Sequence, residues 1–412
     1  MERRWYYVSL VAVAIAISYF DRQTLPVAVT AIQKNIPLSN QQFSYLGTAF
    51  LLSYAVLYVV GGRLLDVLGT RRGFMVIMIG WSLASALHAA ATGFSVLLLA
   101  RLALGAGEGG AFPAAARVVA EWIPTHARST AMGLINAGTA VGSLLAPPLI
   151  GLVLLHSGWR AMFVLSGALG LVWVLWWSLS YRPNNDTVSV NTVDARVAAR
   201  RMTFGEVVKM RNVQTFVFAK FMSDSAWYFL LFWLPKYLYD ARGFDIKHVS
   251  YYAWIPYAAS GIGSFMGGWF SSELLRRGCS LDLSRKLALG LCAAGMPVVM
   301  LVSVSPVRTA IVLFSIAFFC QQAWSGLIMT LPTDVFPLTI VGTVAGLIGF
   351  GGAIGGAIFS LVAGRMLQIG FTYATIFIFV GTFHLIGFLA ILAFAGKIRP
   401  LRFTDLSTGE LV

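Results

Sequence analysis

Charged residues are scarce in this chain, and their scarcity excludes an ordinary soluble protein. Of its 412 residues, 11% are charged and 58% are hydrophobic, with a mean hydropathy of +0.78. Soluble proteins carry about 25% charged residues. The sequence also lacks the alternation over about ten residues that is typical of outer-membrane strands. We therefore expect an all-α integral membrane protein rather than a β-barrel.

Cysteine is nearly absent, and the three that occur do not suggest a disulfide framework or a metal cluster. Cys279, Cys292 and Cys320 fall in one expected loop and two expected helices. The sequence has no Ser/His/Asp arrangement and no His-rich cluster, which argues against an integral-membrane enzyme. We expect no metal and no cofactor. A cleavable signal peptide is also not expected, because the first apolar run is too long for one and contains two charges.

Apolar runs of about 20 residues are abundant, and each can cross roughly 30 Å of hydrocarbon as a helix. They predict twelve transmembrane helices. The expected spans are residues 6–33, 42–61, 73–92, 94–116, 129–154, 159–181, 213–239, 249–271, 287–304, 307–331, 342–366 and 371–396.

Basic residues outnumber acidic ones by 30 to 16, which gives a formal net charge of +14. They crowd into alternate loops, as at Arg71–Arg72, whereas the intervening loops carry scattered ones such as Lys34. This asymmetry follows the positive-inside rule. It predicts a multi-pass protein with both termini in the cytoplasm. We also expect the protein to lie in the cell (inner) membrane and to be a monomer. The positive charge is thus explained by topology, and we expect no binding to nucleic acid.

A polar stretch divides the chain, and internal repetition supports the division. Glu121-Trp-Ile-Pro124 recurs as Asp334-Val-Phe-Pro337, at an offset of 213 residues (334 − 121). Parallel repeats of this kind are typical of rocking-bundle transporters. The expected parts are an N-terminal six-helix bundle (residues 1–181), a cytoplasmic linker (182–212), a C-terminal six-helix bundle (213–400) and a tail (401–412).

Two charges stand side by side inside the first apolar run, at Asp21 and Arg22. One charge near a bilayer centre costs about 2.5–3.5 kcal/mol on insertion scales, so such residues indicate ion or substrate passage. Adjacent helical positions lie about 100° apart and cannot serve the same point. We predict that Asp21 binds a proton and that Arg22 faces the cavity as an anion clamp. Tyr19 and Tyr54 are candidates to bind a polyol, with ordinary packing as the alternative.

A second charged pair, Arg101 and Glu108, lies within the expected helix 94–116. Seven residues separate them (108 − 101), nearly two turns, so they share a face about 10 Å apart. Small residues between them, such as Gly107, allow another helix to approach closely. Ionised Glu108 can neutralise an arginine, and protonated Glu108 releases it for an anion. We predict that Asp21, Glu108 and Arg101 form a proton-coupling group, with a structural ion pair as the alternative.

The second half supplies further polar residues inside apolar runs. Lys220 and Asp224 are four residues apart on one expected helix, so they form either a self-satisfied pair or part of a substrate site. Gln321 is the repeat counterpart of Glu108 (321 − 108 = 213), so we expect it to face the cavity. Trp324 is a further candidate for substrate contact in this half, and Asn136 and Thr139 are candidates in the first half.

The stretch Gly62-Arg-Leu-Leu-Asp66-Val-Leu-Gly-Thr-Arg71-Arg72 resembles the loop signature of the major facilitator superfamily, with two of its basic residues replaced. The resemblance implies that Asp66, Arg71 and Arg72 act in gating. Asp66 can accept hydrogen bonds from a helix N-terminus or an arginine, a latch that breaks when the bundles rock. The alternative is a basic turn that only sets topology.

The whole chain resembles the anion:cation symporter branch of that superfamily, and within it the bacterial hexuronate transporters most. The motifs that carry this are Tyr19-Phe-Asp21-Arg22, Arg101 with Gly107-Glu108-Gly-Gly-Ala-Phe-Pro113, Glu121-Trp-Ile-Pro124, Ala146-Pro147-Pro148, Asn136, and Lys220-x-x-x-Asp224-x-Ala226-Trp227. Galactonate-type relatives have asparagine where this chain has Gly349 and glutamine where it has Thr139. These departures argue against galactonate.

The resemblance implies the major facilitator fold, in which twelve transmembrane helices form two pseudo-symmetric six-helix bundles. It also implies a secondary active transporter that takes up a sugar-acid anion with protons by alternating access, driven by the proton gradient. Hexuronates such as galacturonate or glucuronate are the expected substrates. Proton coupling is implied for Asp21 and Glu108 with help from Arg101, and sugar-acid binding for Tyr19, Arg22 and Tyr54. The alternatives are a symporter of another organic anion (an aldonate, glucarate or an aromatic acid) and an anion antiporter.

Overall fold

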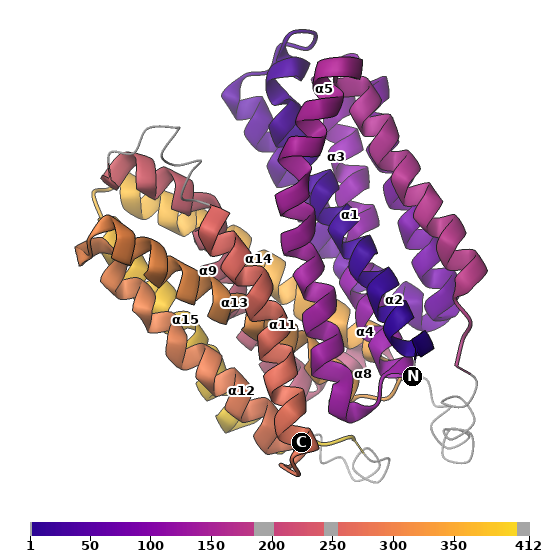
Figure 1. Ribbon diagram of the computed structural model, residues 1–412, viewed down its shortest axis with the longest axis vertical. Helices are drawn as coiled ribbons and strands as arrows, with labels where there is room; N and C mark the ends of the chain where they lie inside the picture. The colour runs from indigo at the N-terminus through magenta and orange to yellow at the C-terminus, as the bar shows by residue number, and fades with distance from the viewer. Residues whose placement is uncertain (1, 185–201, 243–253, 402–412) are drawn as a thin grey trace. The chain divides into compact units, whose positions relative to one another are not determined.

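The computed structural model describes residues 2–184, 202–242 and 254–401, and within these ranges every regular element is a helix and no strand occurs (Figure 1). The all-α prediction is confirmed for this part of the chain. The elements are α1 (Glu2–Gln33), α2 (Asn40–Leu87), η1 (His88–Ala90), α3 (Phe94–Glu108), α4 (Ala111–Trp122), η2 (Thr125–Ala127), α5 (Arg128–Ser180), α8 (Phe204–Lys209), α9 (Arg211–Arg242), α11 (Trp254–Arg276), α12 (Leu281–Gly295), η3 (Met296–Val304), α13 (Val307–Val335), α14 (Val341–Gln368) and α15 (Tyr373–Phe394).

Two helices are too long to be single spans. α2 has 48 residues and α5 has 53, which at 1.5 Å per residue is about 70 and 80 Å, more than twice the hydrocarbon thickness. Each contains one glycine with a positive φ of 77°, Gly69 in α2 and Gly158 in α5. L side chains rarely adopt this conformation, so glycine permits the kink there. Each helix therefore comprises two spans.

Eight helical segments of the described part are long and apolar enough to cross a membrane. Two of them contain the kinks just described and supply two spans each. α9 and α11 are less apolar than these eight, in α9 because Lys220 and Asp224 interrupt its apolar run, but both overlap predicted spans. The eight segments supply ten spans, and α9 and α11 bring the number to the twelve that the sequence predicts.

The predicted helix 94–116 is not continuous. α3 ends at Glu108, and α4 begins at Ala111 after the pair Gly109–Gly110. Glycine is a poor helix former, and two in succession weaken the helix locally. Glu108 therefore lies at a helix end within a predicted span, a position that transporters use for binding sites.

The described chain groups into two compact units whose boundaries differ from those of the two halves of the sequence. Unit 1 and unit 2 each take a short segment from the opposite half, because the first turns of α14 pack with unit 1 and those of α5 with unit 2. The predicted linker (182–212) is described only in part, and α8 and the start of α9 lie in it; the tail lies outside the described residues from 402 onward. Unit 1 comprises Met1–Ile123, Gly138–Met202 and Leu338–Leu347, and unit 2 comprises Pro124–Ala137, Thr203–Pro337 and Ile348–Val412.

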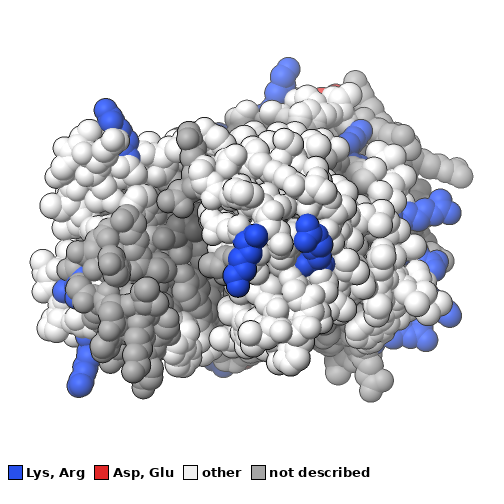
Figure 2. All heavy atoms as spheres, turned by 90° about the horizontal axis from the view of Figure 1, so that it is seen from above, with Lys and Arg blue, Asp and Glu red and all other residues white. Residues whose placement is uncertain are grey.

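The surface is that of a protein in contact with lipid. Large apolar side chains are exposed on the helices, including Leu155 at 85% and Leu361 at 77%. Figure 2 shows one face on which uncharged residues predominate, with Lys and Arg scattered over it and almost no Asp or Glu. An exposed apolar surface of this extent is unusual for a soluble protein and suits a hydrocarbon environment.

Candidate functional site

A buried ion pair joins α1 to α3 within unit 1. Nε of Arg22 lies 2.7 Å from Oε2 of Glu108, and the hydroxyl of Ser18 donates to the same oxygen at 2.7 Å. Glu108 is fully buried, whereas the Arg22 side chain is 17% exposed. Ser18 and Arg22 are four residues apart and so share one face of α1. Two donors from one helix thus converge on a single carboxylate oxygen.

The sequence groups Arg101 with Asp21 and Glu108 for proton coupling and gives a structural ion pair of Arg101 with Glu108 as the alternative. Within the described residues Arg101 makes no ion pair, and the structure pairs Glu108 with Arg22. The Arg101 guanidinium is buried and lies 5.8 Å from the centre of the Phe50 ring. Two turns of one helix separate Arg101 from Glu108, about 10 Å, which exceeds ion-pair distance. The Arg22 side chain reaches Glu108 from the facing helix instead.

Asp21 takes a different partner from its neighbour. The indole N–H of Trp81 on α2 donates to Oδ2 of Asp21 at 2.5 Å, and both side chains are buried. Asp21 and Arg22 therefore bond to different side chains. The sequence analysis identifies neither Trp81 nor Ser18, because a tryptophan or serine in an apolar run is usually a packing residue.

Aromatic rings surround the guanidinium of Arg22. Its Cζ lies 4.4 Å from the ring centre of Tyr54, 4.6 Å from that of Tyr19 and 5.3 Å from that of Phe50. Cation–π contacts at these distances stabilise the cation and orient its plane. The two predicted tyrosines are thus brought to Arg22, and Phe50 is an additional member that the sequence did not single out.

In unit 2, the charged residues of α9 form an ion pair with each other. Nζ of Lys220 lies 3.0 Å from Oδ1 of Asp224 and donates to Oγ of Ser325 on α13 at 3.0 Å. Both side chains of the pair are largely buried. The structure realises the predicted i, i+4 contact and adds a third partner from another helix.

The remaining predicted contacts differ in their surroundings. The amide of Asn136 donates to Oε1 of Gln322 at 2.8 Å and to Oγ of Ser264 at 2.9 Å, so its donors serve packing within unit 2. Thr139 is buried. Gln321 and Trp324 on α13 are also buried, and each retains one polar atom that has no hydrogen-bond partner in the described part of the chain.

The predicted gating residue Asp66 accepts four hydrogen bonds in unit 1. The backbone N–H groups of Gly342 and Thr343, at the start of α14, donate at 3.1 and 2.7 Å, and the Thr343 hydroxyl donates at 2.6 Å. The fourth donor is Nη1 of Arg117, at 2.6 Å. Both predicted kinds of partner, a helix N-terminus and an arginine, meet at this carboxylate. Arg71 and Arg72 are exposed, and Arg71 donates to the carbonyl of Ser178.

Unit 2 contains an uncharged counterpart of the Asp66 contact. Gly267-Gly268 repeats Gly61-Gly62 at an offset of 206 residues (267 − 61), and this offset carries position 66 to Ser272. The Ser272 hydroxyl lies 2.8 Å from that of Ser129 and accepts from the backbone N–H of Thr130 at 3.2 Å. The nearby charges belong to buried Arg285, which pairs with Asp334 at 2.7 Å and donates to the Ser129 hydroxyl at 2.9 Å. The sequence repeat could have located Ser272, but nothing local marked it.

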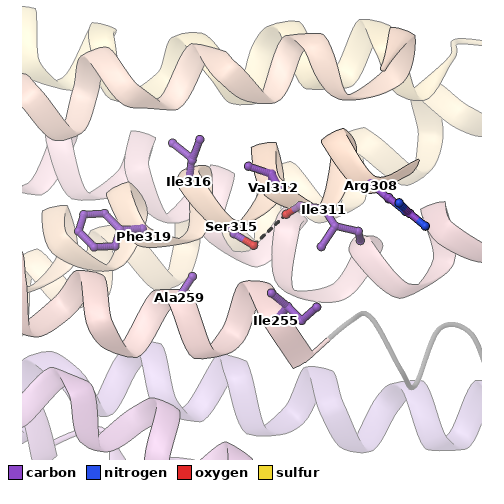
Figure 3. A pocket seen from close by; sticks show the side chains of 8 residues that line it. All are labelled: Ile255, Ala259, Arg308, Ile311, Val312, Ser315, Ile316 and Phe319. Carbon is purple, nitrogen blue, oxygen red and sulfur yellow. Dashed lines mark hydrogen bonds between the residues drawn. The ribbon is translucent and has the colours of Figure 1, made fainter. Parts of the chain in front are cut away.

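The described residues hold no group of three or more His, Cys, Asp or Glu side chains that could bind a metal ion. A cavity of about 570 Å³ lies between α11 and α13 (Figure 3), and none of the predicted site residues lines it. Its lining is apolar except for Arg308 and Ser315, and the Ser315 hydroxyl donates to the carbonyl of Ile311 at 2.8 Å. The polar residues around Arg22 therefore remain the candidate site.

Comparison with known proteins shows the family of this chain. Residues 11–360 match the profile of the Major Facilitator Superfamily. The chain belongs to this superfamily. Members of the superfamily are membrane transporters, so this protein is a multi-pass transporter and not an enzyme.

Two bacterial relatives narrow the resemblance within the superfamily. The hexuronate transporter of Escherichia coli (strain K12) is 31% identical over 94% of this chain and 93% of its own length. The galacturonate transporter of Dickeya chrysanthemi is also 31% identical, over 70% of this chain and 88% of its own. The predicted resemblance to hexuronate transporters is confirmed.

Solved structures agree with the superfamily fold. A crystal structure of the proton:xylose symporter XylE has a TM-score of 0.78 at 15% identity and covers 97% of both chains. A crystal structure of the E. coli fucose:proton symporter FucP has a TM-score of 0.74 at 16% identity, covering 95% of this chain and 98% of its own. At these identities the likeness shows the fold, which is the predicted major facilitator fold.

Proposed function

We propose that this transporter takes up a sugar-acid anion, a hexuronate such as galacturonate or glucuronate, together with protons. The observation that carries the proposal is the ion pair between Arg22 and fully buried Glu108. A buried cation and carboxylate stabilise each other only while both are charged. Protonation of Glu108 therefore weakens its hold on Arg22, whose planar guanidinium then binds a carboxylate through two parallel hydrogen bonds.

The surroundings of Arg22 fit a sugar acid. Tyr19 and Tyr54 lie against the guanidinium and carry hydroxyl groups that can bond to the hydroxyls of a sugar ring. Asp21 adds a second buried carboxyl beside the pair, so the site offers two proton acceptors. The names of the two bacterial relatives support a hexuronate rather than another anion. The further contacts that we propose are Asn136, Thr139, Lys220, Gln321 and Trp324.

Topology and gating belong to the same proposal. The loop charges support an inner-membrane protein with both termini in the cytoplasm, two six-helix bundles joined by the linker, and function as a monomer. Asp66, Arg71 and Arg72 would then lie on the cytoplasmic side. Asp66 would act as the latch there, because its four hydrogen bonds to Arg117 and to the start of α14 must break for the helices to separate.

An uptake assay with the full chain in liposomes tests the function. Labelled galacturonate, glucuronate, galactonate and glucarate are supplied with an inward proton gradient, without a gradient, and to protein-free liposomes. We expect accumulation of the hexuronates that requires the proton gradient. Accumulation of galactonate or glucarate alone would refute the substrate, and gradient-independent equilibration of a hexuronate would refute the coupling.

A further inference from the structure

The two buried carboxyl groups of unit 1 are each bonded through one oxygen only. Oδ2 of Asp21 accepts from Trp81, and Oε2 of Glu108 accepts from Ser18 and Arg22. Oδ1 of Asp21 and Oε1 of Glu108 are buried without a hydrogen-bond partner within the described residues. An ionised carboxylate in an apolar interior requires donors for both oxygens. Each group is therefore incompletely solvated when it is charged.

The donors that occupy the bonded oxygens restrict where a proton can attach. An indole N–H and a guanidinium only donate and cannot accept. Because Trp81 occupies one lone pair of Oδ2, Oδ1 is the favoured site for a proton that neutralises Asp21. Arg22 and Ser18 occupy both lone pairs of Oε2 of Glu108, which leaves Oε1 for the proton. The favoured oxygens are the two that lack a hydrogen-bond partner within the described residues.

Tight packing holds Trp81 in place. A Cβ atom at Gly107 would lie 2.6 Å from Cα of Trp81, so the backbones of α2 and α3 are in contact there. Gly107 directly precedes Glu108, and the Trp81 side chain is fully buried. The indole that bonds to Asp21 is therefore fixed against the same turn of α3 that carries the second carboxyl.

We propose that Trp81 and Ser18 are positioning residues for the proposed proton coupling: they direct protons to Oδ1 of Asp21 and Oε1 of Glu108. The inference rests on the proposed function, because it assumes that these carboxyls bind the transported protons. The charged groups facing Asp21 are Glu108 and Arg101 from α3 and Arg22 from its own helix. Those facing Glu108 are Arg22 from α1 and Arg101 from its own helix.

The test is the pH dependence of hexuronate uptake by the Trp81→Phe variant. Phenylalanine keeps the ring but removes the N–H that stabilises charged Asp21. We expect half-maximal uptake to move to higher external pH by about one unit, the size expected for losing one hydrogen bond to a charged group. Ser18→Ala should move it in the same direction by a smaller amount, because Arg22 still donates to Glu108.

Trp173→Phe is the matched control. Trp173 is another buried tryptophan of unit 1, and its indole donates to the backbone carbonyl of Leu10 at 2.9 Å. This variant loses the same atoms without touching Asp21, so its pH midpoint should equal that of wild type. If neither Trp81→Phe nor Ser18→Ala shifts a midpoint that the wild type shows, the inference is wrong. If wild-type uptake itself has no pH midpoint, the proposed function fails instead.

Discussion

The buried charges of the two units are held in different ways. In unit 1, Arg22 on α1 reaches across to Glu108 on α3, so the pair joins two helices. In unit 2 the ion pair itself lies within α9, between Lys220 and Asp224 one turn apart, and Lys220 also donates to Ser325 on α13. Breaking the first ion pair removes a charged link between two helices, whereas breaking the second removes one within a helix. A switch is therefore better placed in unit 1.

Hydrogen bonding strengthens the contrast. Each carboxyl of the unit 1 site retains a buried oxygen without a partner, whereas neither oxygen of Asp224 is among the buried atoms of the described chain that lack one. Incomplete bonding of a buried carboxyl leaves a place for a proton, whereas Asp224 holds Lys220 at 3.0 Å and is partly exposed. We infer that unit 1 carries the proton chemistry and that Lys220 in unit 2 presents a fixed positive charge.

The largest expected effect comes from Arg22→Gln. The variant loses the cation that pairs with Glu108 and the fork that we propose binds the substrate carboxylate. We expect hexuronate exchange to fall by about 100-fold or more, the size expected when a desolvated charge pair loses one partner. Arg22→Lys keeps the charge without the fork and should be intermediate. Exchange within a few-fold of wild type in Arg22→Gln would remove Arg22 from the site.

A smaller effect should separate structure from substrate binding in unit 2. Lys220→Met leaves Asp224 buried without its partner, which costs about 3–5 kcal/mol of stability. The double variant Lys220→Met/Asp224→Leu removes both charges and should regain most of the thermal stability in detergent. We expect its hexuronate uptake to stay about tenfold below wild type, because the fixed charge is gone. Full uptake by the double variant would assign the pair to structure alone.

The smallest expected effect contrasts the Asp66 latch of unit 1 with its uncharged counterpart at Ser272 in unit 2. Asp66→Asn leaves buried Arg117 without its charged partner and weakens the contact with the start of α14, so we expect a several-fold slower uptake. Ser272→Ala removes one hydroxyl but keeps the bonds of Arg285 to Asp334 and Ser129, so its uptake should be within about twofold of wild type. Initial rates at equal protein density in the liposomes provide the comparison. Equal effects of the two variants would contradict the contrast.

Periodicity and composition predicted the helical membrane fold because apolar length and helix geometry depend on local sequence. They also predicted that Asp21 and Arg22 serve different points, and the i, i+4 contact of Lys220 with Asp224. They did not predict which arginine reaches Glu108. That depends on how α1 packs against α3, and a long side chain such as that of Arg22 can reach a point that helical angles alone assign elsewhere.

Other features depend on contacts that the sequence does not display. Trp81 and Ser18 are ordinary residues for apolar helices, and only the fold brings them to the carboxyl groups. The break after Glu108 follows from Gly109–Gly110, a local signal that the continuous helix expected over residues 94–116 leaves out. The first turns of α5 belong to unit 2 and those of α14 to unit 1 because of their tertiary contacts. No local sequence pattern predicts this grouping.

The central claim is that buried carboxyl groups of unit 1 couple protons to anion movement. It is tested most directly by comparing two assays of Asp21→Asn in liposomes: exchange of labelled hexuronate at equal pH, and accumulation driven by a proton gradient. Asparagine keeps the shape but cannot bind the proton. We predict that exchange persists while gradient-driven accumulation is lost. Accumulation by Asp21→Asn equal to that of wild type would contradict the claim.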